Sequence, residues 1–118
     1  MIEQRLQAFV TATEQADIDA LMSFIHEDCL YITTTGSAPG TEYSGKQQIR
    51  AIFLEILGDD SGEVSYGPLY VKGNRGTLEW KVVTPEPDGS HSTMRGVDLF
   101  EFADDLIIRK DAFCKVRS

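Results

Sequence analysis

One carboxylate of this 118-residue chain lies among apolar residues in a predicted strand. Residues 92–102 are expected to be extended, with Asp98 on the same side as Met94, Phe100 and Phe102, because side chains alternate between the two faces of a strand. An aspartate on an apolar face can be a protonated acid, since desolvation disfavours its charged form. It can equally be an ionised partner of a neighbouring cation, retained for the geometry of the sheet.

A lysine near the C-terminus could supply that cation. The turn residues 103–105 predict a hairpin that places Lys110 roughly opposite Asp98. Such a pair would leave Asp98 ionised. Lys110 could be a paired or snorkelling cation, which is the commoner role. Alternatively, a desolvated Lys110 amine could act as a nucleophile or general base.

Several other side chains could line a pocket around Asp98. Tyr31 and Thr33 share one face of a predicted strand and could both form hydrogen bonds there. His26 follows a predicted helix, and its side chain suits proton transfer near neutral pH, although a lone histidine is more often a surface or capping residue. The predicted apolar wall, which favours an apolar or aromatic ligand, consists of Phe53, Trp80, Met94, Phe100 and Phe102.

Composition excludes several other classes of function. The net charge of −8, from 19 acidic and 11 basic residues, argues against nucleic-acid and anionic-membrane binding. The chain has no glycine-rich phosphate loop or nucleophile elbow, and its two histidines and two cysteines are scattered, so we expect neither cofactor nor metal. Cys29 and Cys114 are expected to be buried reduced thiols. Without a signal peptide or membrane-spanning run, we expect a cytoplasmic protein.

The elements that would position these residues follow an α+β order, helices first and strands after. Apolar residues at helical spacing predict a first helix over about residues 1–10 and a second from Asp17, its N-cap, to about Ile25. Residues 29–35 read as a strand and residues 36–40 as a loop. A third helix is predicted from the capping box of Ser44 and Gln47 to Leu57, with Gly58 ending it. Short turns then separate four predicted strands at 64–71, 77–84, 92–102 and 106–116.

Three stretches of the chain carry a resemblance to a known family. They are Leu6 to Asp28, Tyr43-Ser44-Gly45 with the helix after it, and the segment from Gly96 to Phe102 that leads into Ile107-Ile108. Over nearly its whole length the chain resembles the nuclear transport factor 2-like superfamily, in its SnoaL-like and ketosteroid-isomerase-like branch. The resemblance implies one domain over residues 1–118, with helices packed on a strongly curved antiparallel sheet as a cone-shaped α+β barrel. It also implies a homodimer formed through the outer sheet face.

The resemblance extends to the active-site motif of ketosteroid isomerases only in part. Their Asp-x-Phe-x-Phe strand, whose protonated Asp donates a hydrogen bond to an oxyanion, is matched by Asp98 to Phe102. The family's general base falls at about Thr33 and its catalytic tyrosine at about Phe9. Neither side chain can perform the family's role, so steroid isomerisation by that mechanism is not expected.

A second branch, the limonene epoxide hydrolases, matches less well. Its Arg and one Asp come from the strand in which Leu78 and Trp80 point inward here, and its other Asp falls at about Ala112. The neighbouring Asp111 does not replace it, because a one-residue slip turns a strand side chain to the opposite face.

Two classes of function follow. The first is a cofactor-free acid–base enzyme (isomerase, cyclase, dehydratase or hydrolase) acting on an apolar carbonyl-bearing molecule, with Asp98 as the acid or orienting group and with Tyr31, Thr33 and Lys110 as supporting contacts. The second is a non-catalytic ligand-binding or interaction module. A lone Asp–Lys pair, without a further titratable group beside Asp98, favours the second. Docking through the outer sheet face is a third possibility, and its alternating charges predict a polar surface: Glu79, Lys81, Arg95 and Glu101.

Overall fold

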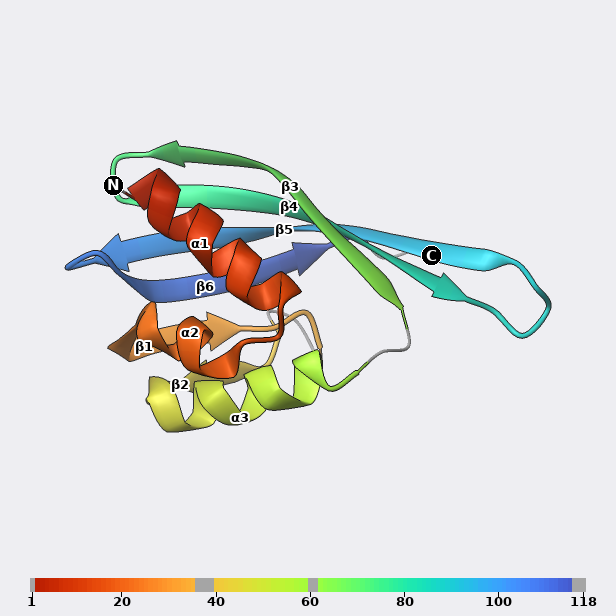
Figure 1. Cartoon of the computed structure of the whole chain (residues 1–118), viewed down its shortest axis with the longest axis horizontal. Helices are drawn as coiled ribbons and strands as arrows, with labels where there is room; N and C mark the ends of the chain where they lie inside the picture. Colours follow the sequence, from red (N-terminus) through yellow and green to blue (C-terminus); the bar gives the residue numbers. More distant parts are fainter. Residues whose placement is uncertain (1, 36–39, 60–61, 116–118) are drawn as a thin grey trace.

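Three helices from the first half of the chain lie against one side of a curved six-stranded sheet (Figure 1). The computed structural model of the protein describes residues 2–35, 40–59 and 62–115. The helices are α1 (Ile2–Glu14), α2 (Ile18–Ser23) and α3 (Gly45–Leu57). None of the helices in the described ranges is long and apolar enough to cross a membrane.

The second helix is shorter than its apolar spacing predicts. Asp17 is its N-cap, as expected, and accepts a hydrogen bond from the Ala20 backbone N–H at 3.2 Å. The helix ends at Ser23, whereas we predicted helix to about Ile25. Ile25 instead opens strand β1 (Ile25–Ile32), where it is fully buried and pairs with Ile107. Pairing in the sheet overrides the local helical pattern, and this difference also moves His26 from a helix end into a strand.

Helix α3 begins and ends where the sequence predicts. Ser44 is its N-cap and Gly58 its C-cap, but the expected capping box has a different partner. The Ser44 backbone N–H donates to Gln48 Oε1 at 2.9 Å, and the Ser44 side chain makes no capping bond. Ser44 also ends a three-residue strand, β2 (Glu42–Ser44), which pairs antiparallel with β1 and was not predicted. Apart from Gly40, the predicted loop at 36–40 lies outside the described residues.

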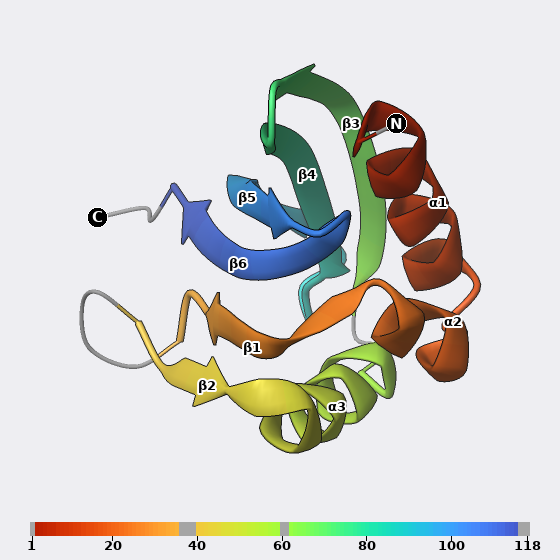
Figure 2. The ribbon, with the colours of Figure 1, turned by 90° about the vertical axis from the view of Figure 1, so that its left-hand side faces the viewer.

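The sheet has the strand order β2-β1-β6-β5-β4-β3. The remaining strands are β3 (Glu63–Lys72), β4 (Arg75–Pro85), β5 (His91–Ala103) and β6 (Leu106–Cys114). All neighbouring pairs are antiparallel except β1 with β6, which is parallel. Figure 2 shows the sheet bending from β3, beside α1, to β2, beside α3. The expected cone is therefore confirmed, but it is an open sheet rather than a closed barrel.

Hairpin register decides which side chains meet. The predicted β5–β6 hairpin is confirmed, with Asp104 and Asp105 at φ values of 52° and 62° in its turn. A register shift after Glu101 places Lys110 opposite Phe100 rather than opposite Asp98, which faces Ala112. The observed partner of Lys110 is thus two residues from the predicted one. Because side chains two residues apart on a strand share a face, Lys110 still projects from the same face as Asp98.

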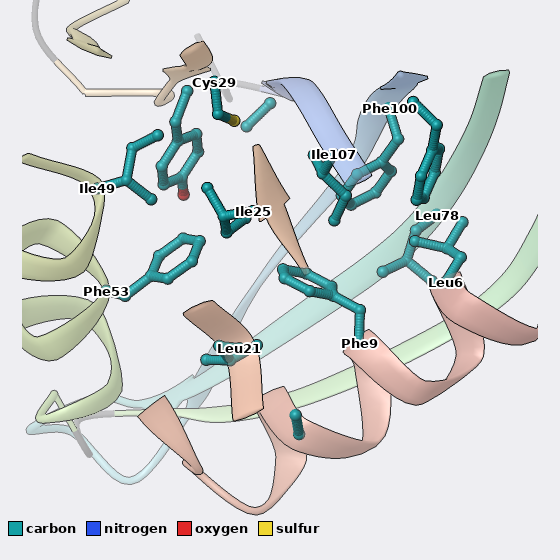
Figure 3. Packing of buried hydrophobic residues seen from close by; sticks show 14 of the residues in the cluster. Leu6, Phe9, Leu21, Ile25, Cys29, Ile49, Phe53, Leu78, Phe100 and Ile107 are labelled. Atoms are coloured by element: carbon teal, nitrogen blue, oxygen red, sulfur yellow. The ribbon is translucent and has the colours of Figure 1, made fainter. Parts of the chain in front are cut away.

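The core lies between the helices and the concave face of the sheet (Figure 3). Phe9 of α1 lies between Phe53 of α3 and Phe100 of β5, with ring centroids 6.3 Å and 5.8 Å away. Leu6 and Leu78 are fully enclosed beside it. These contacts fix the distance between the helices and the strands that carry Asp98 and Lys110.

Candidate functional site

Asp98 lies on the concave face of β5 and is bound at both carboxylate oxygens. Oδ1 accepts a hydrogen bond from Trp80 Nε1 at 3.0 Å, and Oδ2 lies 3.2 Å from Lys110 Nζ. The side chains of Asp98 and Lys110 are only 8% and 10% exposed. A buried carboxylate with an ammonium on one oxygen and an indole N–H on the other is held as an anion. This is the ion-paired arrangement that the sequence offered as one of its two alternatives.

The absence of a side chain at Gly96 allows Trp80 to reach Asp98. Gly96 is opposite Trp80 in the β4–β5 pair, and the indole lies directly across it. A Cβ at position 96 would stand 2.2 Å from Trp80 Cζ2 and 2.3 Å from the Phe113 carbonyl oxygen. No side chain fits in that space, so the glycine positions the indole N–H against the carboxylate.

Lys110 is held between its carboxylate partner and two aromatic rings. Its Nζ lies 4.0 Å from the centroid of the Tyr31 ring and 5.9 Å from that of Phe100. Burial alone would lower the pKa of Lys110, but the combined attraction of Asp98 and Tyr31 outweighs it and holds the pKa above its ordinary value. Lys110 is thus a protonated hydrogen-bond donor at neutral pH, and the arrangement does not support its use as a free amine nucleophile.

The buried thiol of Cys29 lies close enough to Lys110 for the ammonium charge to affect its pKa. Burial raises the pKa of Cys29 to about 11, and the Lys110 ammonium only partly opposes the effect. Cys29 is therefore an unreactive thiol. Both cysteines are free, as predicted, but Cys114 is partly exposed rather than buried.

Tyr66 is a member of this neighbourhood that the sequence analysis did not identify. It lies in β3 opposite Trp80 and is partly buried against the core. Burial raises the pKa of Tyr66, the charge of Asp98 raises it further, and the charge of Lys110 opposes both. Its inward position depends on a bulge in β3 that strict alternation along the strand cannot anticipate.

The remaining predicted site residues are distributed over three regions. Thr33 is buried, but its hydroxyl shares a 2.9 Å hydrogen bond with the Thr35 hydroxyl and lies 3.3 Å from the Thr41 carbonyl oxygen. Phe53 belongs to the core between α3 and the sheet. Met94 is 39% exposed and lies further along β5, opposite Val82.

His26 is not brought to the Asp98–Lys110 pair. It lies at the start of β1, whereas the Tyr31 ring that contacts Lys110 comes near the end of that strand. Its Nδ1 accepts a local hydrogen bond from the Asp28 backbone N–H at 3.0 Å.

Asp111 projects from the opposite face of the sheet, as expected from its one-residue offset from Ala112. It pairs with Leu99 in β5, which is 41% exposed on the outer face. Its Oδ2 lies 3.1 Å from Arg109 Nη2. Within the described ranges, no three His, Cys, Asp or Glu side chains are grouped closely enough to hold a metal ion.

The outer face is less polar than its alternating charges predict. Two grooves of about 310 and 580 Å³ lie there and share the lining residues Tyr70, Thr77 and Leu99. Four of the charged residues around them form two ion pairs, Arg95 with Glu79 at 3.9 Å and Arg75 with Glu101 at 3.5 Å. The grooves are also lined by large, exposed apolar side chains: Tyr70, Leu99 and Phe113.

The fold and the sequence together define the family. Residues 6–110 match the family model of the SnoaL-like domain, so the chain belongs to the SnoaL-like family within the NTF2-like fold. A search of curated proteins found no match.

Solved structures share the fold at low sequence identity. An NTF2-like protein of unknown function from Mesorhizobium loti is 23% identical and superposes with a TM-score of 0.84, covering 98% of this chain and 91% of that one. A protein from Kribbella flavida proposed to be a ketosteroid isomerase is 12% identical, with a TM-score of 0.82 over 99% of this chain and 79% of that one. A proposed polyketide cyclase from Xanthomonas campestris pv. campestris is 19% identical, with a TM-score of 0.74 over 94% and 87%.

The buried ion pair predicts a specific pattern of stabilities. Removing either partner, by Asp98→Asn or Lys110→Met, should lower the free energy of unfolding by about 3–5 kcal/mol, because the remaining polar group is left buried without its counterpart. The double variant should be more stable than either single variant. Urea denaturation measures this, with Arg75→Met as control, because its exposed pair with Glu101 should contribute less than about 1 kcal/mol. A Lys110→Met effect as small as the control's would contradict the buried pair.

The titration of Lys110 should reverse direction when its partner is neutralised. In the wild type its pKa should lie above the ordinary lysine range, and in Asp98→Asn below it, because burial then acts without the carboxylate. Since the folded-state pKa is raised, the stabilisation by the pair should be complete at neutral pH and up to about pH 10, and should be lost above it as Lys110 deprotonates. Nitrogen NMR of Nζ measures the pKa, and an unchanged value in Asp98→Asn would contradict the assignment.

Proposed function

We propose that the protein binds a small, largely apolar molecule against the concave face of the sheet, with Lys110 donating a hydrogen bond to an oxygen of that molecule. The observation that carries this proposal is the balance between hydrogen-bond donors and acceptors at the site. Asp98 accepts from Trp80 and Lys110, whereas an ammonium has three N–H groups, of which one is directed at Asp98 and a second bonds to the Tyr31 side chain, so that one is left for a ligand. The site therefore has donor capacity remaining and little acceptor capacity.

The surroundings of the pair favour an apolar ligand. The ammonium is flanked by the rings of Tyr31 and Phe100, and the carboxylate by the indole of Trp80. Further along the same face, Val64 and Met94 lie on either side of Val82 and are 48% and 39% exposed. Apolar walls with a few convergent polar groups are typical of small-molecule sites.

In this proposal Asp98 orients Lys110 and does not transfer a proton. A carboxylate that is already ion-paired cannot donate a proton in the way a protonated acid would. The pair is neutral as a whole, so Lys110 can present its N–H groups without leaving an uncompensated charge in the apolar site.

A cofactor-free enzyme is the second candidate. Two structurally similar proteins are proposed to be a ketosteroid isomerase and a polyketide cyclase, and both names are those of enzymes acting on carbonyl compounds. Here Lys110 would stabilise an oxyanion that develops on the substrate. The position where a general base is expected holds Thr33, whose hydroxyl is engaged by Thr35 and lies against the Thr41 carbonyl. Ligand binding therefore has the stronger support.

Trp80 provides a direct test, because it is the only tryptophan in the chain and it contacts Asp98. Quenching of its fluorescence by 4-nitrophenol and by nitrobenzene compares two probes of similar shape, of which only the first carries a phenol oxygen. The wild type should bind 4-nitrophenol about tenfold more tightly, since a hydrogen bond to a charged donor distinguishes the two. Lys110→Met should remove that preference, and Lys81→Met, on the exposed outer face, should keep it. Equal affinity of the wild type for both probes would refute the proposal.

We further propose that two copies of the chain associate through the outer face. The support is the apolar surface of Tyr70, Leu99 and Phe113 together with the grooves beside it. Analytical ultracentrifugation should find a dimer for the wild type and a monomer for Leu99→Arg, with Leu54→Arg on α3 as control. A monomeric wild type would contradict this arrangement. The cytoplasmic location and the single domain over residues 1–118 stay predictions.

A further inference from the structure

The hydroxyl of Tyr66 has no assigned role in the site described so far. We infer that Tyr66 is the second hydrogen-bond donor of the concave face, and that it contacts the same ligand oxygen as Lys110. This inference rests on the proposed function and extends it. It assigns a ligand-contacting residue on a third strand, and it restricts the ligand to molecules whose polar end accepts hydrogen bonds.

A bulge in β3 turns Tyr66 toward the site. Tyr66 pairs with Trp80 and Leu69 with Leu78, so that Gly67 and Pro68 together face one residue of β4. A bulge of this kind bends a strand and re-aims its side chains. Gly67 adopts a φ of 115°, which other residues rarely tolerate, and its missing Cβ would meet no atom within 4 Å. The glycine is thus required by backbone conformation and not by packing.

The register connects Tyr66 to the ion pair through neighbouring strands. Trp80 stands between Tyr66 and Gly96 in the sheet, and its indole reaches Asp98 on β5. Paired residues in antiparallel strands project from the same face. The side chain of Tyr66 therefore lies on the concave face, partly buried against the core and on the same side as Asp98 and Lys110.

The electrostatic surroundings agree with this placement. The charges of Lys110 and Asp98 both act on the Tyr66 phenol, and burial, the largest influence, raises its pKa. The phenol is consequently protonated at neutral pH and can donate. Within the described part of the chain, no hydrogen bond engages this hydroxyl, whereas both oxygens of Asp98 are already occupied.

Two donors without a free carboxylate define the chemistry of the ligand. Lys110 and Tyr66 would both direct protons at one oxygen, and a ligand that needed to donate would find Asp98 occupied. The class that fits best is a planar apolar molecule with a ketone, enolate or phenolate oxygen. The last two fit most closely, because hydrogen bonds to a charged acceptor are the stronger ones.

Tyr66→Phe tests the inference by removing one oxygen and keeping the ring. Its affinity for 4-nitrophenol should fall about three- to tenfold, the range for a single hydrogen bond, while its affinity for nitrobenzene should not change. Trp80 fluorescence measures both affinities. Tyr70→Phe is the matched control, because Tyr70 is 63% exposed and lines the outer grooves, and it should alter neither affinity. Equal urea midpoints for the two variants and the wild type would show that the fold is intact.

The outcomes separate the inference from the proposed function. If Lys110→Met loses the preference for 4-nitrophenol and Tyr66→Phe keeps it, the inference is overturned and the proposed function stands. If Tyr66→Phe weakens both probes equally, Tyr66 contributes packing instead of a hydrogen bond, and the inference is again overturned. A wild type without any preference would overturn both.

Discussion

The ion pair between Asp98 and Lys110 is the constraint on which the rest of the concave face depends. Taking a carboxylate and an ammonium out of water costs several kcal/mol for each ion, and only close contact with further polar partners offsets that cost. The structure supplies those partners from different strands. Trp80 donates to the carboxylate, and the Tyr31 ring faces the ammonium. Each partner also needs room beside the pair. The Trp80 indole, for example, occupies the space that a side chain at Gly96 would fill. A single pair thus links β1, β4, β5 and β6.

The same strands carry a different chemistry on their other side. Leu99 and Asp111 follow directly after Asp98 and Lys110 in their sequences, yet they belong to the outer face, with its exposed apolar surface and its paired charges. Side chains alternate along a strand, so two adjacent residues can belong to two separate surfaces with no contact between them. The bulge at residues 67–68 is the exception to this alternation, and it adds Tyr66 to the concave side.

The arrangement of donors and acceptors around Asp98 differs from that of the ketosteroid-isomerase motif that the strand resembles. A fold of this kind supports many functions, so the function must be argued from the side chains in the site. Here the carboxylate of the Asp-x-Phe-x-Phe motif is present at Asp98, but it is engaged by an ammonium and cannot act as a protonated donor. Donation is left to Lys110. The place of the general base is occupied by Thr33, whose hydroxyl is engaged with neighbouring threonines. At the positions matched to that motif, a hydrogen-bond donor is therefore present at Lys110, and a side chain suited to act as a general base is not.

The sequence by itself determined most of the elements and the identity of the central pair. Helical and alternating apolar patterns report the burial of local faces, so three helices, the three hairpins and the inward position of Asp98 could be predicted. Tertiary structure decided the rest, because it depends on pairing between distant segments. Ile25 became a strand residue through its pairing with Ile107, and β2 formed against β1. The inward turn of Tyr66 and the contact of Trp80 with Asp98 arise from bulges and registers that no local pattern encodes.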